Sequence, residues 1–144
     1  MLLFGLPVMA LLLTGCPDIS RELIVVRVDG VTIRVSVAAT DDTRRRGLMQ
    51  RQHLEENEGM LFVYPDQKIL RLWMLDTPLP LDAGFFDRDG VMVGHLSMRS
   101  DGGMHTYASP APAMYALEMS HGWFVRNGIT PGARLALPYT IEGR

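Results

Sequence analysis

The sequence predicts a mainly β fold: a single-domain β-sandwich or barrel-like sheet of about eight short strands with two short helices. Runs of β-branched and aromatic residues alternate with closely spaced turn signals along most of the chain. A strong hairpin signal opens the folded part, and only two segments carry helix signals. An α+β fold is the alternative that this pattern leaves open.

The folded part opens with a β-hairpin. Residues 23–28 form a β-branched run, and Asp29-Gly30 is a favoured two-residue turn. The next run, 31–38, alternates apolar and polar residues, which predicts a strand with one buried side and one side facing water. The polar side chains expected to face water are Thr32, Arg34 and Ser36.

Two segments carry helix signals. Thr40 is a good N-cap, and the two aspartates that follow it suit the positive end of a helix. This helix is expected to run to about Arg51 and to bury Leu48. The second helix is expected to be short, with Ser120 as its cap and an end near Gly128.

The rest of the chain consists mainly of predicted strands. They are residues 60–64, 69–75, 83–86, 91–96, 113–119 and 133–137. Between the second and third of them, Pro78 and Pro80 make a stiff connection that cannot lie in a central strand. Residues 97–106 are expected to form a loop.

The composition indicates an ordinary globular protein. Of its 144 residues, 47% are hydrophobic and 21% are charged, which excludes a disordered chain. The formal net charge of -2 offers no basic footprint for nucleic acid. Arg44-Arg45-Arg46 is the one cluster of basic residues. We expect residues 23–144 to form one domain, monomeric and without a cofactor.

The N-terminal segment is typical of an export signal. Residues 1–13 are almost wholly apolar but too short to cross a bilayer, which takes about 20 residues. The following Leu13-Thr14-Gly15-Cys16 resembles the lipobox of bacterial lipoprotein signals. The resemblance implies a signal peptide over 1–15, then a lipidated Cys16 and tether over 16–22. The protein is then expected in the periplasm or cell envelope, anchored to the membrane through Cys16. Since Cys16 is the single cysteine, the folded part has no disulfide or thiolate metal cluster.

Several short motifs follow one another in a distinctive order. They are Val35-Ser36-Val37-Ala38-Ala39-Thr40, Arg46-Gly47-Leu48-Met49, Gly59-Met60-Leu61-Phe62-Val63-Tyr64, Trp73-Met74-Leu75-Asp76-Thr77, Leu79-Pro80-Leu81-Asp82, Asp89-Gly90, Tyr107, Ala116-Leu117-Glu118 and Gly128-Ile129. This set resembles the family of unknown function numbered 192 among such domains. The resemblance implies a small, β-rich, secreted or envelope protein and no settled activity. The chain departs from the family where Asp76 replaces the usual Asn, and where Met104 and His105 stand in place of a frequent Cys.

The first candidate site is the segment from Trp73 to Asp82. Its prolines hold the loop rigid, and an indole beside carboxylates is typical of a sugar-binding face. We therefore expect a non-catalytic domain that binds a ligand, a glycan or a protein partner through Trp73, Asp76, Thr77, Asp82 and Tyr107. In the alternative, Trp73 fills the core, Asp76 caps a turn and Asp82 pairs with an arginine.

The second candidate is Glu118, which interrupts an apolar run. A buried carboxylate needs a partner or a raised pKa. With Asp76 or Asp82, Glu118 could form the acid–base pair of a small envelope hydrolase, the alternative function. Otherwise Glu118 faces water from an edge strand or pairs with an arginine such as Arg46.

A third set combines imidazoles and thioethers. These soft ligands, His95, Met98, Met104 and His105, would suit Cu(I) in a periplasmic copper-handling protein. The alternative is that the methionines fill the core and that the histidines lie in loops. Because no tightly spaced ligand pair is present, we expect no metal site.

Overall fold

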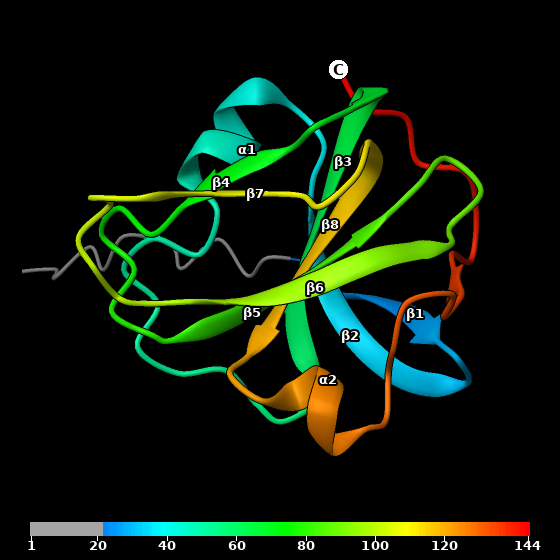
Figure 1. Ribbon diagram of the computed structural model, residues 1–144, viewed down its shortest axis with the longest axis horizontal. Coiled ribbons are helices and arrows are strands. Elements are labelled where there is room, and N and C mark those ends of the chain that lie inside the picture. Colours follow the sequence, from blue (N-terminus) through cyan, green and yellow to red (C-terminus); the bar gives the residue numbers. More distant parts are fainter. Residues whose placement is uncertain (1–21) are drawn as a thin grey trace, which may run out of the picture.

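The computed structural model describes residues 22–144. The predicted signal peptide, Cys16 and most of the tether lie outside these residues. The described part confirms the mainly β fold, and its nine strands and two short helices follow in chain order (Figure 1). They are β1 (Ile24–Val28), β2 (Val31–Ala38), α1 (Asp41–Arg46), β3 (Glu58–Lys68), β4 (Arg71–Trp73), β5 (Leu81–Phe86), β6 (Met92–Met98), β7 (Thr106–Ala108), β8 (Ala113–Ser120), α2 (Trp123–Arg126) and β9 (Leu135–Ala136). None of the helices in residues 22–144 has the length and apolar character needed to cross a bilayer.

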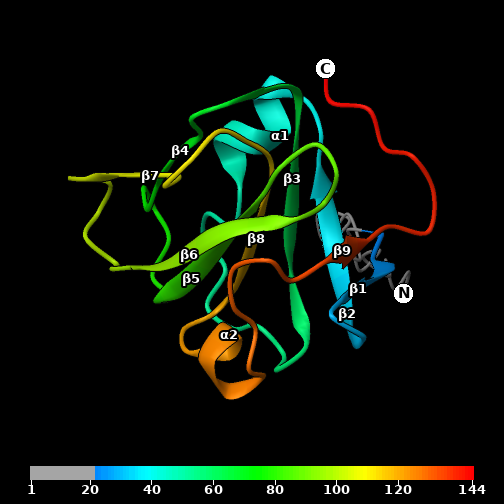
Figure 2. The same cartoon turned by 45° about the vertical axis from the view of Figure 1, so that its right-hand side comes forward.

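A seven-stranded sheet in the order β6-β5-β8-β3-β2-β1-β9 forms the body of the protein. Its strands pair antiparallel except for β2 and β3, which run parallel. The sheet curls, and an isolated antiparallel bridge between Val91 and Arg134 joins the beginnings of its two edge strands (Figure 2). The small β4–β7 sheet and α1 lie together at one end, and α2 lies at the other (Figure 1).

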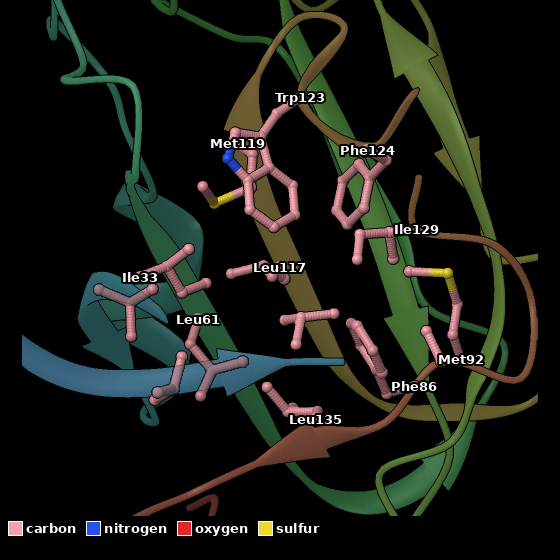
Figure 3. Packing of buried hydrophobic residues seen from close by; sticks show 14 of the residues in the cluster. Ile33, Leu61, Phe86, Met92, Leu117, Met119, Trp123, Phe124, Ile129 and Leu135 are labelled. Atoms are coloured by element: carbon pink, nitrogen blue, oxygen red, sulfur yellow. The ribbon is translucent and has the colours of Figure 1, made fainter. Parts of the chain in front are cut away.

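Each face of the large sheet buries its own hydrophobic cluster, because side chains alternate along every strand. On one face, Trp123 and Phe124 of α2 pack edge to face, with ring centroids 5.2 Å apart, against Leu61, Leu117 and their neighbours (Figure 3). The other cluster includes Met60, Phe62, Leu72, Ala83 and Met98. The β4–β7 sheet therefore covers the second face.

The two helices differ from their predicted bounds. Thr40 and Thr43 form a reciprocal capping box at the start of α1, as the N-cap prediction expects. The helix ends at Arg46 rather than near Arg51, because Gly47 has a φ of 47°, outside the helical region. Leu48 is buried as predicted, although it lies beyond the helix.

The start of α2 also differs from the prediction. Gly122, and not Ser120, is the N-cap, and a glycine has no side chain that could bond the helix. The carboxylate of Asp82 instead accepts a hydrogen bond from the Gly122 backbone N–H at 2.8 Å. Asp82 of β5 therefore supplies the cap that the sequence analysis expected from the neighbouring Ser120.

Two further predictions fail where distant segments meet. Residues 97–106 were expected to form a loop, but the first two of them end β6 and Thr106 begins β7, which pairs with β4. Ser36 was expected to face water but is buried, because it lies beside Met60 of β3 on the covered face of the sheet. Both differences arise from the β4–β7 sheet, which forms a second layer over the large sheet.

Candidate functional site

A pocket of about 320 Å³ opens between α1, β4 and the covered face of the large sheet. Its walls come from α1 and the turn after it, from β3 and β8, and from β4 with its neighbours. The lining residues are Asp41, Arg44, Arg45, Arg46, Gly47, Leu48, Met49, Phe62, Tyr64, Arg71, Leu72, Trp73, Leu75, Thr77, Thr106 and Glu118. The pocket thus brings together Trp73, Thr77 and Glu118, which are far apart in the sequence.

Glu118 lies at the buried side of this pocket. It pairs with Met60 of β3 and Ala83 of β5, so its side chain shares their covered face of the sheet. The residue is only 4% exposed, and its carboxyl group forms no hydrogen bond or ion pair within residues 22–144. Burial raises the pKa of this carboxyl to about 8. The group is therefore mostly protonated at pH 7 and can both donate and accept hydrogen bonds.

Arg44 is held firmly at the wall of the pocket. Its Nη1 donates to the carbonyl oxygen of Val63 at 2.7 Å, and its Nη2 lies 2.6 Å from Oδ1 of Asp41. The guanidinium also lies over the ring of Tyr64, 4.8 Å from the centroid. Burial raises the pKa of Tyr64, an effect that the Arg44 charge opposes and the Glu118 charge adds to. Arg44 is therefore a structural cation that fixes Tyr64 near Glu118.

Two other arginines of the pocket have no such partners. Arg45 lies 3.2 Å from Asp42, but the guanidinium groups of Arg46 and Arg71 form no hydrogen bond or ion pair with any residue from 22 to 144. Both are exposed and come from different elements, the end of α1 and the start of β4. They are available to a ligand at the rim.

Trp73 lies on the same rim and is 41% exposed. It is the last residue of β4 and pairs with Thr106 of β7, which also lines the pocket. Trp73 therefore does not fill the core, a role that belongs to Trp123, whose exposure is 0%.

Asp76 and Thr77 line a second, more open pocket of about 470 Å³. Thr77 also lines the first pocket, where its Oγ1 donates to the carbonyl of Leu75 at 2.9 Å. Asp76 has a left-handed backbone with a φ of 48°, and its carbonyl accepts a hydrogen bond from the Gln50 N–H at 2.7 Å. Asn and Asp tolerate this conformation better than most residues. The turn itself therefore accounts for an Asn or Asp at this position.

Asp82 lies on the opposite face of the sheet from Glu118. Since Ala83 is paired with Glu118, its neighbour Asp82 must point to the other side of β5. There its carboxylate is buried and lies 2.9 Å from His121 Nδ1, besides capping α2 through Gly122. Asp82 thus pairs with a histidine rather than an arginine, and it shares no cleft with Glu118.

Tyr107 contributes to neither of the two pockets. Its hydroxyl donates to Oδ2 of Asp101 at 3.1 Å and accepts from the Arg99 N–H at 3.1 Å. His105 Nδ1 lies 2.9 Å from the same Asp101 oxygen. Tyr107 therefore holds the loop before β7 in place.

The soft-ligand residues do not converge. His95 and Met98 point to opposite faces of β6, where His95 stacks on Phe124 and Met98 is buried in the second cluster. Met104 is 82% exposed. Within residues 22–144, no three His, Cys, Asp or Glu side chains are grouped closely enough to hold a metal ion.

Sequence reasoning overlooked the basic wall of the pocket. The run Arg44-Arg45-Arg46 was visible as the one cluster of basic residues but was given no ligand-binding role, and no pattern marked Arg71. These side chains are gathered because α1 and the β4–β7 sheet lie over the face of the large sheet that β3 and β8 form.

Comparisons with known proteins agree on the family and the fold. The family described as "Uncharacterized ACR", DUF192, matches residues 24–137. A solved structure from Sinorhizobium meliloti 1021, described as a candidate transcription regulator, is 31% identical, with a TM-score of 0.73, over 82% of this chain and 95% of that one. A protein of unknown function from Novosphingobium aromaticivorans DSM 12444 is 26% identical, with a TM-score of 0.77, over 84% of this chain and 89% of that one. The search of curated proteins finds no match.

Proposed function

Because the chain belongs to the DUF192 family, whose description assigns no activity, we propose its function from the pocket: it binds a small saccharide, without catalysis, at the bacterial cell envelope. One observation carries the proposal. A buried carboxyl without a partner in residues 22–144 faces a pocket that has an exposed tryptophan at its rim.

The unpartnered carboxyl of Glu118 favours a bound ligand as its partner. No fully buried side-chain oxygen within residues 22–144 lacks a hydrogen-bond partner, so the Glu118 oxygens reach the solvent in the pocket. A ligand hydroxyl would take the place of that solvent as their hydrogen-bond partner. The pocket volume of about 320 Å³ lies at the lower end of the range for small-molecule sites.

The rim favours a saccharide among small ligands. The indole of Trp73 offers a flat apolar surface for the C–H face of a sugar ring, while Glu118 and the hydroxyl of Thr106 are polar groups for its hydroxyls. The rigid prolines that follow Trp73 suit accurate placement of this surface.

A hydrolase is the weaker alternative. The protonated Glu118 would suit a general acid, but catalysis by two carboxyl groups needs a second one in the same pocket. The other carboxylate that lines the pocket is Asp41, which is bound to Arg44. The Asp76 carboxylate belongs to the neighbouring pocket and Asp82 to the opposite face. We therefore favour binding over catalysis.

Replacing Trp73 with alanine is expected to weaken saccharide binding at least about tenfold, because the stacking surface is lost. A glycan array identifies a saccharide that binds, and isothermal titration calorimetry then compares the affinities of the two proteins. Tyr139→Ala is the matched control, since Tyr139 is 59% exposed and lies outside the pocket. Equal affinity of the Trp73→Ala variant and the wild type, or hydrolysis of the bound saccharide, would contradict the proposal.

The envelope location rests on the apolar run before Cys16 and on the lipobox-like Leu13-Thr14-Gly15-Cys16. A Cys16→Ser variant is expected to lose lipidation and to leave the membrane fraction, because the sulfur that would carry the first lipid is absent. Labelling of cells with a palmitate analogue, followed by fractionation, measures both effects. Equal labelling of the variant and the wild type would remove this part of the proposal.

A further inference from the structure

We infer that the saccharide bound in this pocket is acidic, with its carboxylate held by Arg46 and Arg71 at the rim and its ring hydroxyls directed to Glu118. This inference rests on the proposed function and adds the chemical class of the ligand. It also assigns a role to two arginines that the fold leaves unused.

The charge around the pocket favours an anion. Four guanidinium groups line it, while the carboxyl groups that line it are those of Asp41 and Glu118. Burial raises the pKa of Glu118 to about 8, so at neutral pH this group adds little negative charge. The chain as a whole has a formal net charge of -2, so the positive field is local to this site.

The partners of the four arginines separate structural from available cations. Arg44 is bound to Asp41 and to the carbonyl of Val63, and Arg45 is bound to Asp42. Arg46 and Arg71 have no partner for their guanidinium groups within the described part of the chain. Arginine is suited to binding a carboxylate through two parallel hydrogen bonds.

The position of the two arginines matches a ligand that has one charged end and one uncharged end. Both side chains are exposed, whereas Glu118 is buried, and all three line the same pocket. A carboxylate at the rim would remain near water, and the uncharged part of the sugar would enter between Trp73 and Glu118. A protonated Glu118 can donate a hydrogen bond to a hydroxyl there and does not repel the ligand carboxylate.

The test compares ligands that differ only in charge. Calorimetry of the full-length protein would use oligosaccharides of galacturonic, glucuronic and N-acetylmuramic acid, each beside its neutral methyl ester. We expect at least one acid to bind about tenfold more tightly than its ester, with an affinity that falls as salt rises. Arg46→Gln and Arg71→Gln should each remove most of this preference, because they weaken acid binding far more than ester binding. Arg134→Gln, an exposed arginine outside the pocket, is the control.

Each remaining outcome has a distinct meaning. Equal affinity for acid and ester would overturn the inference and leave saccharide binding intact. An acid preference that survives in both arginine variants would overturn the assignment of Arg46 and Arg71. If no acid binds but a neutral glycan binds in a Trp73-dependent manner, the inference fails alone. If no saccharide of either kind binds, the proposed function fails with it.

Discussion

The Glu118→Gln variant is expected to be more stable than the wild type at pH 7, by about 3 kcal/mol in the free energy of unfolding. In the folded protein burial raises the pKa of the carboxyl to about 8 from its ordinary value of 4.5. Glutamine has nearly the same shape and carries no proton that can be lost. The variant therefore keeps the neutral state that the fold favours.

The direction of the pH effect follows from proton binding. Between pH 4.5 and about 8 the folded state holds the Glu118 proton, while the unfolded state has released it. Wild-type stability must therefore fall as pH rises through this window, by about 1.4 kcal/mol for each pH unit. This contribution to stability is fully present below pH 4.5, and above about pH 8 no more of it is lost.

Urea unfolding curves from pH 4.5 to 9 measure this effect. We expect the wild-type and Glu118→Gln curves to give similar stability at pH 4.5 and to diverge as pH rises. Glu142→Gln is the control, because Glu142 is exposed. The stability of this variant should depend on pH in the same way as that of the wild type. Parallel pH dependence in the Glu118→Gln variant and the wild type would show that the carboxyl is not held in its neutral state.

The loss of stability that the Glu118 carboxyl causes at neutral pH also connects this residue to the proposed binding role. An apolar side chain at this position would cover the second cluster without a pH-dependent loss of stability. Residues that lower stability in this way are typical of functional sites, where activity needs a group that folding alone disfavours. A ligand that hydrogen-bonds the neutral carboxyl would recover part of the lost stability.

Local signals predicted the parts of the fold that depend on local chemistry. The hairpin of β1 and β2 was predicted because Asp29-Gly30 fixes the turn and the alternation of 31–38 fixes the faces. The length of α1 was not predicted correctly. Gly47 and Gln50 have positive φ angles that end the helix early, and these conformations depend on the surrounding packing. The cap of α2 was missed for a similar reason, since Asp82 lies 40 residues before Gly122.

The candidate site required information on strand register. Trp73, Thr77 and Glu118 were each predicted as candidates, but their meeting in one pocket depends on the pairing of β4 with β7 and of β8 with β3. The register between β5 and β8 also places Glu118 and Asp82 on opposite faces of the sheet. The alternation of residues within each strand could not reveal this, because it does not say which residues of the two strands are paired. The chemistry of single residues was thus predictable, whereas their grouping was not.

Replacing Gly59 with alanine is expected to lower the free energy of unfolding by about 3 kcal/mol, at the upper end of the usual range for overpacking. Gly59 lies in β3 opposite Met119 of β8. A Cβ atom at this position would collide with the backbone carbonyl oxygen of Glu118 and with the sulfur of Met119. The sulfur could move, but the carbonyl belongs to a central strand and can shift only if the strand shifts. Gly59 is therefore the residue that lets the two strands approach beside Glu118.

The control for this substitution is Gly128→Ala. A Cβ at Gly128 meets nothing within 4 Å, so the variant reports only the strain of a φ of 65°, about 1 kcal/mol. Urea unfolding compares the two variants, and the binding assay then tests whether the shift of β8 disturbs the pocket. We expect Gly59→Ala to weaken saccharide binding as well, because any displacement of the Glu118 backbone moves its carboxyl. If Gly59→Ala loses no more stability than Gly128→Ala, close strand contact is not the reason for glycine at this position.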